Sequence, residues 1–83
     1  MTLGSVDLTV VIVVYNAVKF LEPCLDSLQL ALSDIRHEII LVDNGSTDGS
    51  RQYMDNLPSR FRVIVNSENR GFAAANNQGI DQA

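Results

Sequence analysis

Several residue types that mark specialised classes of protein are scarce in this chain. Its 83 residues include one cysteine, one histidine and no tryptophan. A single cysteine excludes an intrachain disulfide and is weakly consistent with a reducing compartment. We expect Cys24 to pack within a helix, because no histidine or second cysteine lies near it in the sequence to make it a nucleophile.

Basic residues are also few. Six Lys and Arg stand against ten Asp and Glu, which gives a formal net charge of -4. A general nucleic-acid-binding protein would carry a basic face, so we expect no nucleic-acid partner. Hydrophobic residues make up 46% of the chain and charged residues 19%. These values are ordinary for a globular domain and argue against a disordered chain.

Long apolar runs are absent. The longest one extends from Val10 to Val14, whereas a helix needs about 20 apolar residues to cross a bilayer. The N-terminus lacks the basic region and the cleavage pattern of a signal peptide. We therefore expect a cytoplasmic protein, and peripheral attachment to the inner face of the membrane stays open.

Common ligand-binding motifs are missing too. No Gly-x-Gly-x-x-Gly follows either of the first two predicted strands, which argues against a dinucleotide oxidoreductase, and no Gly-x-x-x-x-Gly-Lys phosphate loop occurs. A calcium loop can be half-aligned from Asn44, but its terminal glutamate is missing and a strand precedes it. We predict no metal ligand in the chain.

The chain does contain an alternation of strand and helix patterns. Apolar, β-branched runs predict strands over residues 8–15, 37–42 and 61–66. Steps of three and four predict a helical stripe between the first two strands, formed by Val18, Leu21, Leu25, Leu28, Leu32 and Ile35. Because a proline fits only near a helix start, Pro23 indicates that this helix begins close to Phe20 or Glu22.

Two further helices complete the pattern. Ser46 or Thr47 is a suitable cap for a short helix that runs to about Asn56. Residues 70–83 read as a last helix, and the apolar residues near one of its faces are Phe72, Ala75, Ile80 and Ala83. The order β-α-β-α-β-α predicts an α/β fold with a three-stranded parallel sheet and right-handed crossovers. Such a sheet keeps unpaired edges, so we interpret the chain as the first portion of a longer domain.

Polar residues follow each predicted strand. They are Tyr15 and Asn16, then Asp43 and Asn44, then residues 66–70. The carboxyl ends of parallel strands meet at one edge of the sheet, where ligands of open α/β sheets bind. An aromatic ring can stack on a base, a carboxylate can accept a hydrogen bond from a base or ribose, and an arginine can pair with phosphate. The sequence therefore predicts a nucleotide site.

Each of these residues also has a purely structural explanation. Tyr15 could close the core, and Asp43 could cap the turn that follows it. Asn44 and Gly45 could simply form a turn, because both tolerate positive φ. Arg70 could be an ordinary surface residue. The convergence of all these turns on one edge is harder to explain on structural grounds alone.

The last helix contains residues that disfavour a helix. Asn76 and Asn77 compete for the backbone, and Gly79 costs about 1 kcal/mol relative to alanine. This pattern indicates that a close approach or side-chain hydrogen bonding is favoured over local stability. The alternative is a weak terminal helix that the rest of the domain holds in place.

Three ordered segments carry a family resemblance. They are TVVIVVYN over residues 9–16, EIILVDNGSTDGS over residues 38–50 and NRGFAAANNQGI over residues 69–80. Together they resemble the N-terminal half of a family 2 glycosyltransferase, and the last segment is similar to rhamnosyltransferase-like bacterial members. The resemblance covers residues 8–83. It implies a GT-A fold and inverting transfer of a sugar from a nucleoside diphosphate to an acceptor hydroxyl, as in bacterial surface polysaccharide synthesis.

The resemblance also implies a donor-binding set. Tyr15 and Asp43 would contact the base or ribose, and Arg70 and Gly71 would border the base and diphosphate. The whole predicted set is Tyr15, Asn16, Asp43, Asn44, Arg70, Gly71, Asn76 and Asn77. The expected donor is a UDP- or dTDP-sugar, and the expected acceptor is a carbohydrate or a lipid-linked molecule.

Two parts of such an enzyme are missing from the sequence. The acidic motif that holds a divalent cation, Mg or Mn, would follow the last helix, and Asp81 is too early to belong to it. The general base would lie further on, so no catalytic residue is assigned. Residues 1–83 are therefore expected to be an incomplete N-terminal nucleotide-sugar-binding portion of one glycosyltransferase domain, inactive alone.

Two other functions stay open. One is another nucleotide-dependent transferase, such as a nucleotidyltransferase, although that class usually has a glycine-rich basic loop after its first strand and residues 15–19 contain no glycine. The other is a non-catalytic binding module that associates with itself through an exposed sheet edge.

Overall fold

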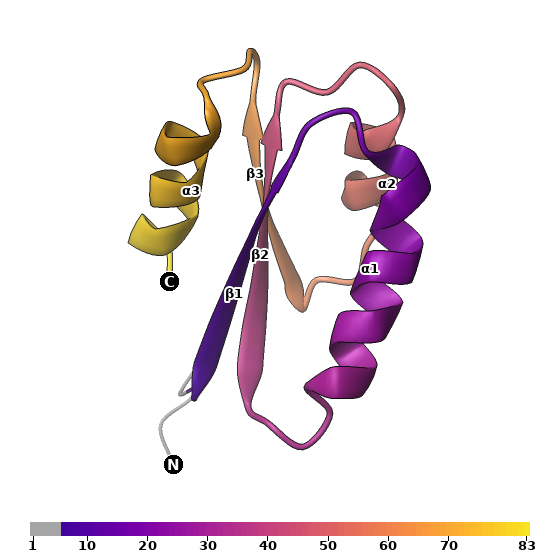
Figure 1. Cartoon of the computed structure of the whole chain (residues 1–83), viewed down its shortest axis with the longest axis vertical. Coiled ribbons are helices and arrows are strands. Elements are labelled where there is room, and N and C mark those ends of the chain that lie inside the picture. Colours follow the sequence, from indigo (N-terminus) through magenta and orange to yellow (C-terminus); the bar gives the residue numbers. More distant parts are fainter. Residues whose placement is uncertain (1–5) are drawn as a thin grey trace.

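The computed structural model describes residues 6–83. Its elements, in chain order, are β1 (Leu8–Val14), α1 (Val18–Ala31), β2 (His37–Asn44), α2 (Ser50–Asp55), β3 (Phe61–Asn66) and α3 (Phe72–Asp81). The strands form one parallel sheet in the order β1-β2-β3. Helices α1 and α2 lie on one face of the sheet and α3 lies on the other (Figure 1). The predicted α/β fold with a three-stranded parallel sheet is confirmed.

The main core lies between the sheet and the pair α1 and α2. Leu21 and Leu25 of α1 and Met54 of α2 pack with Ile39 and Leu41 of β2, and each of the five is at most 3% exposed. Burial stabilises the fold by about 1.5–3 kcal/mol for a side chain of this size. The central strand thus anchors both helices, which explains its uninterrupted apolar run.

Helix α3 packs on the opposite face through its small residues. Ala75 and Gly79 are buried, and a Cβ at Gly79 would overlap a methyl group of Val11 on β1. The predicted apolar face of this helix is wrong in part, because Phe72 and Ile80 are 70% and 53% exposed. A helix this close to a sheet has room only for small side chains beneath it.

Helix α1 starts earlier than the proline suggests. It begins at Val18, and Pro23 lies inside it. A proline there removes one helical N–H donor, and the carbonyl that loses its partner belongs to Lys19, an exposed residue, so water can replace that donor. Cys24 is also exposed, which corrects the expectation that it packs inside.

Helix α2 starts later than predicted. It begins at Ser50, and the residue before it, Gly49, has φ 101° with no side-chain cap. Ser46 and Thr47 therefore do not cap the helix. Strand β2 extends to Asn44, so the polar residues at its end still pair with β3. None of the helices in residues 6–83 is long and apolar enough to cross a membrane.

Candidate functional site

The three loops at the carboxyl ends of the strands lie together at one end of the molecule (Figure 1). They comprise residues 15–17 after β1, 45–49 after β2 and 67–71 after β3. The register places Val14 beside Asp43 and Asp43 beside Val65. The polar residues that follow each strand therefore share one edge of the sheet, which we call the carboxyl rim.

Asp43 is the last but one residue of β2 and is only 1% exposed. Its Oδ1 accepts a hydrogen bond from the Ser46 N–H at 3.1 Å, so it does cap the turn. Its Oδ2 has no partner within residues 6–83. At 1% exposure almost none of the carboxylate is open to solvent, so its contact with a ligand stays a prediction.

The ring of Tyr15 stands at the rim and does not close the core. Tyr15 is 51% exposed, so an apolar flat face is available for stacking. The next residue, Asn16, has φ 48°, and its Oδ1 accepts from the Thr47 N–H at 2.7 Å. The backbone therefore changes direction at Asn16, the residue directly after Tyr15.

Asn44 holds the third loop in place. It is 2% exposed, and its Nδ2 donates to Asn69 Oδ1 at 2.9 Å and to the Gly71 carbonyl at 3.3 Å. Its Oδ1 accepts from the Arg70 N–H at 2.9 Å and from Asn66 Nδ2 at 3.3 Å. These bonds occupy the amide, so its direct contact with a ligand stays a prediction.

Glycine is needed where two of the loops meet. Gly45 has φ 88°, and a Cβ there would lie 2.8 Å from the backbone carbon of Glu68. A larger residue would force the second and third loops apart. The turn after Asn44 therefore also sets the position of the third loop.

Arg70 and Gly71 lie in the third loop. The side chain of Arg70 is exposed and makes no hydrogen bond or ion pair with residues 6–83, so its guanidinium is free for an anion. Gly71 has φ 83° and precedes α3, and its N–H donates to Asn69 Oδ1 at 2.7 Å.

The two asparagines of α3 do not account for its unfavourable sequence. Asn77 is exposed and Asn76 is partly exposed, and neither side chain makes a hydrogen bond within the described residues. The residue of α3 that does form side-chain hydrogen bonds is Gln78, which makes two with Asn66, at 2.7 and 2.9 Å. The residue that lets α3 approach the sheet closely is Gly79. A role for the asparagines near a ligand stays a prediction.

Sequence reasoning did not find the role that Asp48 has in the second loop. Asp48 accepts hydrogen bonds from the Val18 N–H, the Ser50 N–H and the Ser50 hydroxyl. The Ser50 hydroxyl holds the pKa of Asp48 below its ordinary value of 3.8. The one signal in the sequence is the alternation of Ser46, Asp48 and Ser50 after a glycine, a composition that favours side-chain-to-backbone turns.

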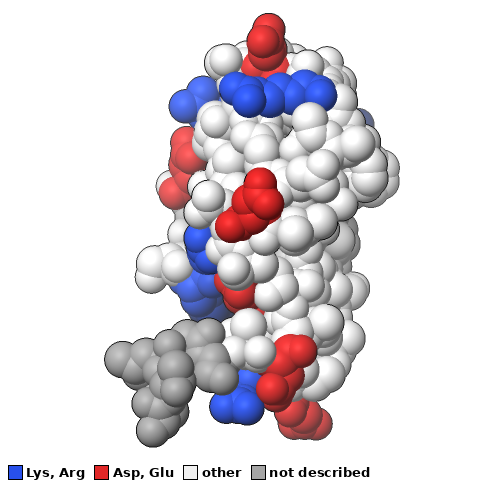
Figure 2. Space-filling model, turned by 90° about the vertical axis from the view of Figure 1, so that its left-hand side faces the viewer, with Lys and Arg blue, Asp and Glu red and all other residues white. Residues whose placement is uncertain are grey.

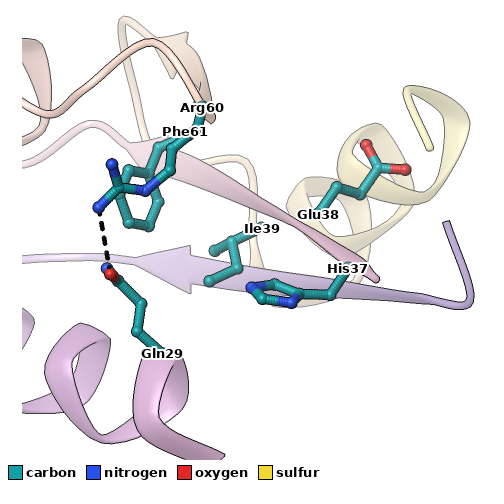
Figure 3. A pocket seen from close by; sticks show the side chains of 6 residues that line it. All are labelled: Gln29, His37, Glu38, Ile39, Arg60 and Phe61. Atoms are coloured by element: carbon teal, nitrogen blue, oxygen red, sulfur yellow. Dashed lines mark hydrogen bonds between the residues drawn. The ribbon is translucent and has the colours of Figure 1, made fainter. Parts of the chain in front are cut away.

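A cavity of about 240 Å³ lies at the other end of the sheet. Arg60 extends across it and donates to Gln29 Oε1 at 3.1 Å, beside His37 (Figure 3). The remaining lining residues are Glu38, Ile39 and Phe61. Ligand pockets usually measure about 300–1,000 Å³, and parallel α/β sheets bind ligands at the carboxyl ends of their strands. The carboxyl rim is therefore the better candidate site.

The side of the molecule that carries α3 has a mixed charge. Acidic and basic side chains alternate down this side, and a broad part of it is uncharged (Figure 2). No continuous basic area runs over the described residues in this view. This side therefore has no surface suited to following a phosphate backbone.

The described residues do not form a metal centre. Within residues 6–83, no three His, Cys, Asp or Glu side chains are grouped so that they could hold a metal ion. Both oxygens of Asp48 accept hydrogen bonds, and so does one oxygen of Asp43. This donor set does not fit a divalent cation.

Comparison with known proteins identifies the family. The sequence model of Glycosyl transferase family 2 matches residues 9–83. The chain belongs to this family. This family 2 glycosyltransferase chain is 38% identical over 79 residues to glycosyltransferase GlyG of Streptococcus pneumoniae. The alignment covers 92% of this chain and 26% of GlyG. It is 34% identical over 80 residues to the teichoic acid poly(glycerol phosphate) polymerase of Staphylococcus epidermidis, covering 90% of this chain and 11% of that protein.

A solved glycosyltransferase shares the fold of this family 2 chain. It is a mannosyltransferase, PcManGT from Pyrobaculum calidifontis, in complex with GDP-Man and Mn2+. The TM-score is 0.73 at 27% identity, over 98% of this chain and 25% of the mannosyltransferase. The chain has the Rossmann-like first half of a GT-A domain, as the resemblance implied. It spans only 22% and 26% of the first two curated relatives that it matches.

Proposed function

We propose that this chain is the donor-nucleotide-binding part of a glycosyltransferase that moves a sugar, with inversion, from a nucleoside diphosphate to an acceptor hydroxyl. One observation carries the proposal. At the carboxyl rim, the exposed Tyr15 and the free guanidinium of Arg70 lie in the first and third loops, and Asp43 lies between them near the end of β2. The mannosyltransferase of the same fold binds GDP-Man and Mn2+, which supports a nucleotide-sugar ligand.

Each side chain at the rim has a chemical role in this proposal. The ring of Tyr15 stacks on the base, and Asp43 Oδ2 accepts a hydrogen bond from a base N–H or a ribose hydroxyl. Arg70 pairs with diphosphate oxygens through its planar fork, and Gly71 lets the backbone come close to them. Asn16, Asn44, Asn76 and Asn77 complete the proposed donor site.

The biological setting follows from the relatives. The family includes GlyG and a polymerase named for teichoic acid. We propose bacterial surface polysaccharide synthesis at the cytoplasmic side of the membrane, with a UDP- or dTDP-sugar as donor and a carbohydrate or lipid-linked acceptor. The segment over residues 69–80 supports a rhamnosyltransferase-like subtype.

The catalytic parts are assigned to other residues of the protein. The described residues offer no metal centre, and the chain spans only 22% and 26% of two relatives. We propose that the ligands of a Mg or Mn ion and the general base lie outside this chain. Bound to the diphosphate, the cation would neutralise charge on the leaving group. Residues 1–83 would then bind the donor without completing the transfer.

Calorimetry tests the proposal directly. UDP, dTDP and GDP, each with and without Mg2+ or Mn2+, are titrated into the folded chain, whose folding is checked by circular dichroism. At least one nucleotide should bind with a dissociation constant of about 1 μM to 1 mM, the ordinary range for enzyme substrates. A folded chain that binds none of them would contradict the proposed function.

A second function is favoured by the sheet edges. Within residues 6–83, β1 and β3 each pair with a strand on one side only, and unpaired edges are templates for association. We propose self-association through these edges as the alternative to donor binding. The family match favours a glycosyltransferase over a nucleotidyltransferase.

A further inference from the structure

We propose that Ser46, Asp48 and Ser50 form a loop staple, which positions Tyr15 by fixing the loop after β1 to the loop after β2. The inference rests on the proposed function, because it gives these residues a role in binding the donor nucleotide. They would act through the backbone of the first loop and would not touch the nucleotide. None of them belongs to the donor-binding set predicted from the sequence.

Four of the five hydrogen bonds between residues 16–18 and residues 46–50 have a backbone N–H as donor. The Asn16 N–H donates to Ser46 Oγ at 3.0 Å, and the Thr47 N–H donates to Asn16 Oδ1 at 2.7 Å. The Ala17 N–H donates to Ser50 Oγ at 3.1 Å, and the Val18 N–H donates to Asp48 Oδ2 at 3.1 Å. Every residue from Asn16 to Val18 is therefore held by the second loop or by Ser50, the first residue of α2.

The staple replaces a cap that α1 lacks. The first N–H groups of a helix have no partner within the helix, and the residue at the N-cap position of α1 is Ala17, which makes no side-chain cap. Asp48 and Ser50 supply the missing acceptors from a loop about 30 residues further along the chain. A carboxylate at this helix end is also favoured by the helix dipole.

The staple is itself held together internally. Ser50 is fully buried, and its hydroxyl donates to Asp48 Oδ1 at 2.6 Å. The Ser50 N–H donates to the same oxygen at 2.9 Å. The carboxylate can therefore hold α1 with one oxygen and its own loop with the other, which a neutral amide cannot do.

The geometry next to Tyr15 depends on these bonds. Asn16 has φ 48°, a left-handed conformation that asparagine adopts more readily than most L-residues and that the neighbouring loop holds here. Hydrogen bonds with Ser46 and Thr47 hold it. The side chain of Tyr15 makes no hydrogen bond with residues 6–83, so no polar contact of its own holds the ring, and the staple holds the backbone directly after it.

The test separates positioning from ordinary stabilisation with a double-mutant cycle. Asp48→Asn keeps the shape of the side chain, but the amide has only one oxygen and cannot accept the hydrogen bonds that Oδ1 and Oδ2 of the carboxylate accept. The matched control is Asp55→Asn, which removes the same charge from an exposed residue that makes no hydrogen bond or ion pair within the described residues. Calorimetry with the nucleotide that the unaltered chain binds best gives the affinity of each variant and of each variant combined with Tyr15→Ala.

We expect Tyr15→Ala to weaken binding about tenfold, the size of a lost base–aromatic stack. Asp48→Asn should weaken binding about fivefold in the presence of Tyr15 and less than about twofold in its absence, since coupled residues are not additive. Asp55→Asn should leave the affinity unchanged. Equal losses from Asp48→Asn with and without Tyr15, or no loss, would overturn the inference while the proposed function stands.

Amide hydrogen exchange supplies a readout that needs no nucleotide. Asp48→Asn should speed exchange at Asn16, Ala17 and Val18, and unchanged exchange there would overturn the staple. If the unaltered chain binds no nucleotide, the proposed function fails, and the staple's role in binding fails with it.

A second variant is used if Asp48→Asn does not fold. Ser46→Ala removes only the acceptor of the Asn16 N–H and takes the place of Asp48→Asn in the same cycle. Its expected loss of affinity is about two- to threefold.

Discussion

At the scale of single residues, two carboxylates of the same loop region are used differently. Asp43 accepts one hydrogen bond from the turn that it begins and keeps one oxygen without a partner. Both oxygens of Asp48 accept hydrogen bonds, from two backbone N–H groups and one hydroxyl. The first arrangement suits recognition of a ligand, and the second suits the holding of a loop. Their positions in the sequence do not distinguish these roles, but their partners do.

Asp43→Asn isolates the recognition role. The amide keeps an oxygen that can accept from the Ser46 N–H, so the turn should survive, whereas the negative charge offered to the ligand is lost. A hydrogen bond to a charged group is worth about 1.5–3 kcal/mol, so nucleotide affinity should fall at least about tenfold. Calorimetry checks this result, with Asp34→Asn, an exposed residue of the turn between α1 and β2, as the control. Unchanged affinity would remove Asp43 from the donor site.

Asp48 should make the stability of the chain depend on pH. Its pKa is lowered in the folded state, first by the Ser50 hydroxyl. A lowered pKa stabilises the fold above the unfolded value, which is near 3.8, and this contribution is lost as the pH falls through the folded value. The unaltered chain should therefore be more stable than Asp48→Asn at pH 7. Urea unfolding at a series of pH values should show this difference shrinking below about pH 4; a constant difference would contradict the assignment.

At the scale of elements, the two faces of the sheet are packed by different rules. Leucine and methionine side chains fill the space under α1 and α2. Under α3 the space is nearly closed, and the helix rests on Ala75 and Gly79. This close packing, together with the paired amides of Asn66 and Gln78, sets the place of α3 and of the loop before it.

Gly79→Ala tests the close approach. Alanine should improve helix propensity by about 1 kcal/mol, but its methyl group would overlap Val11, and overpacking costs about 1–3 kcal/mol. We expect a net loss of about 1 kcal/mol in the free energy of unfolding, measured with urea. Adding Val11→Ala should recover part of the loss caused by the overlap. A Gly79→Ala chain that is more stable than the original would show that α3 has room to move away.

At the scale of the whole molecule, the sheet is covered on both faces but open at both edges. β2 lies in the centre with its apolar residues buried, while β1 and β3 each have one unpaired side. The chain also spans only 22% of one relative and 26% of another. These facts agree with the proposal that the chain is the donor-binding part of a glycosyltransferase, and they also leave a surface that another strand could join.

Self-association through the edges predicts a mass that depends on concentration. Light scattering over a hundredfold range of concentration should show dimers or larger species growing with concentration if edges pair. The net charge of -4 adds repulsion that salt screens, so association should increase with ionic strength. A constant monomeric mass at low and high salt would count against the self-associating alternative and leave donor binding as the function.

The sequence by itself determined the elements and their order. The β-branched runs specify three strands, of which β2 is the buried one. The spacing of Leu21 and Leu25 specifies the buried stripe of α1, and the alternation specifies parallel pairing. It also determined that polar residues follow each strand, because strand ends can be read from where the apolar run stops. Local pattern suffices for these features, since each depends on neighbours within a few residues.

Tertiary structure alone decided how those polar residues are used. α1 begins at Val18 because Asp48 supplies its missing acceptor, and Phe72 faces solvent because α3 lies too close to the sheet to bury it. The amide of Asn44 holds a loop about 25 residues away, and the carboxylate of Asp43 is buried and accepts the Ser46 N–H. Each of these facts depends on a contact between distant parts of the chain, and no local pattern records which donor meets which acceptor.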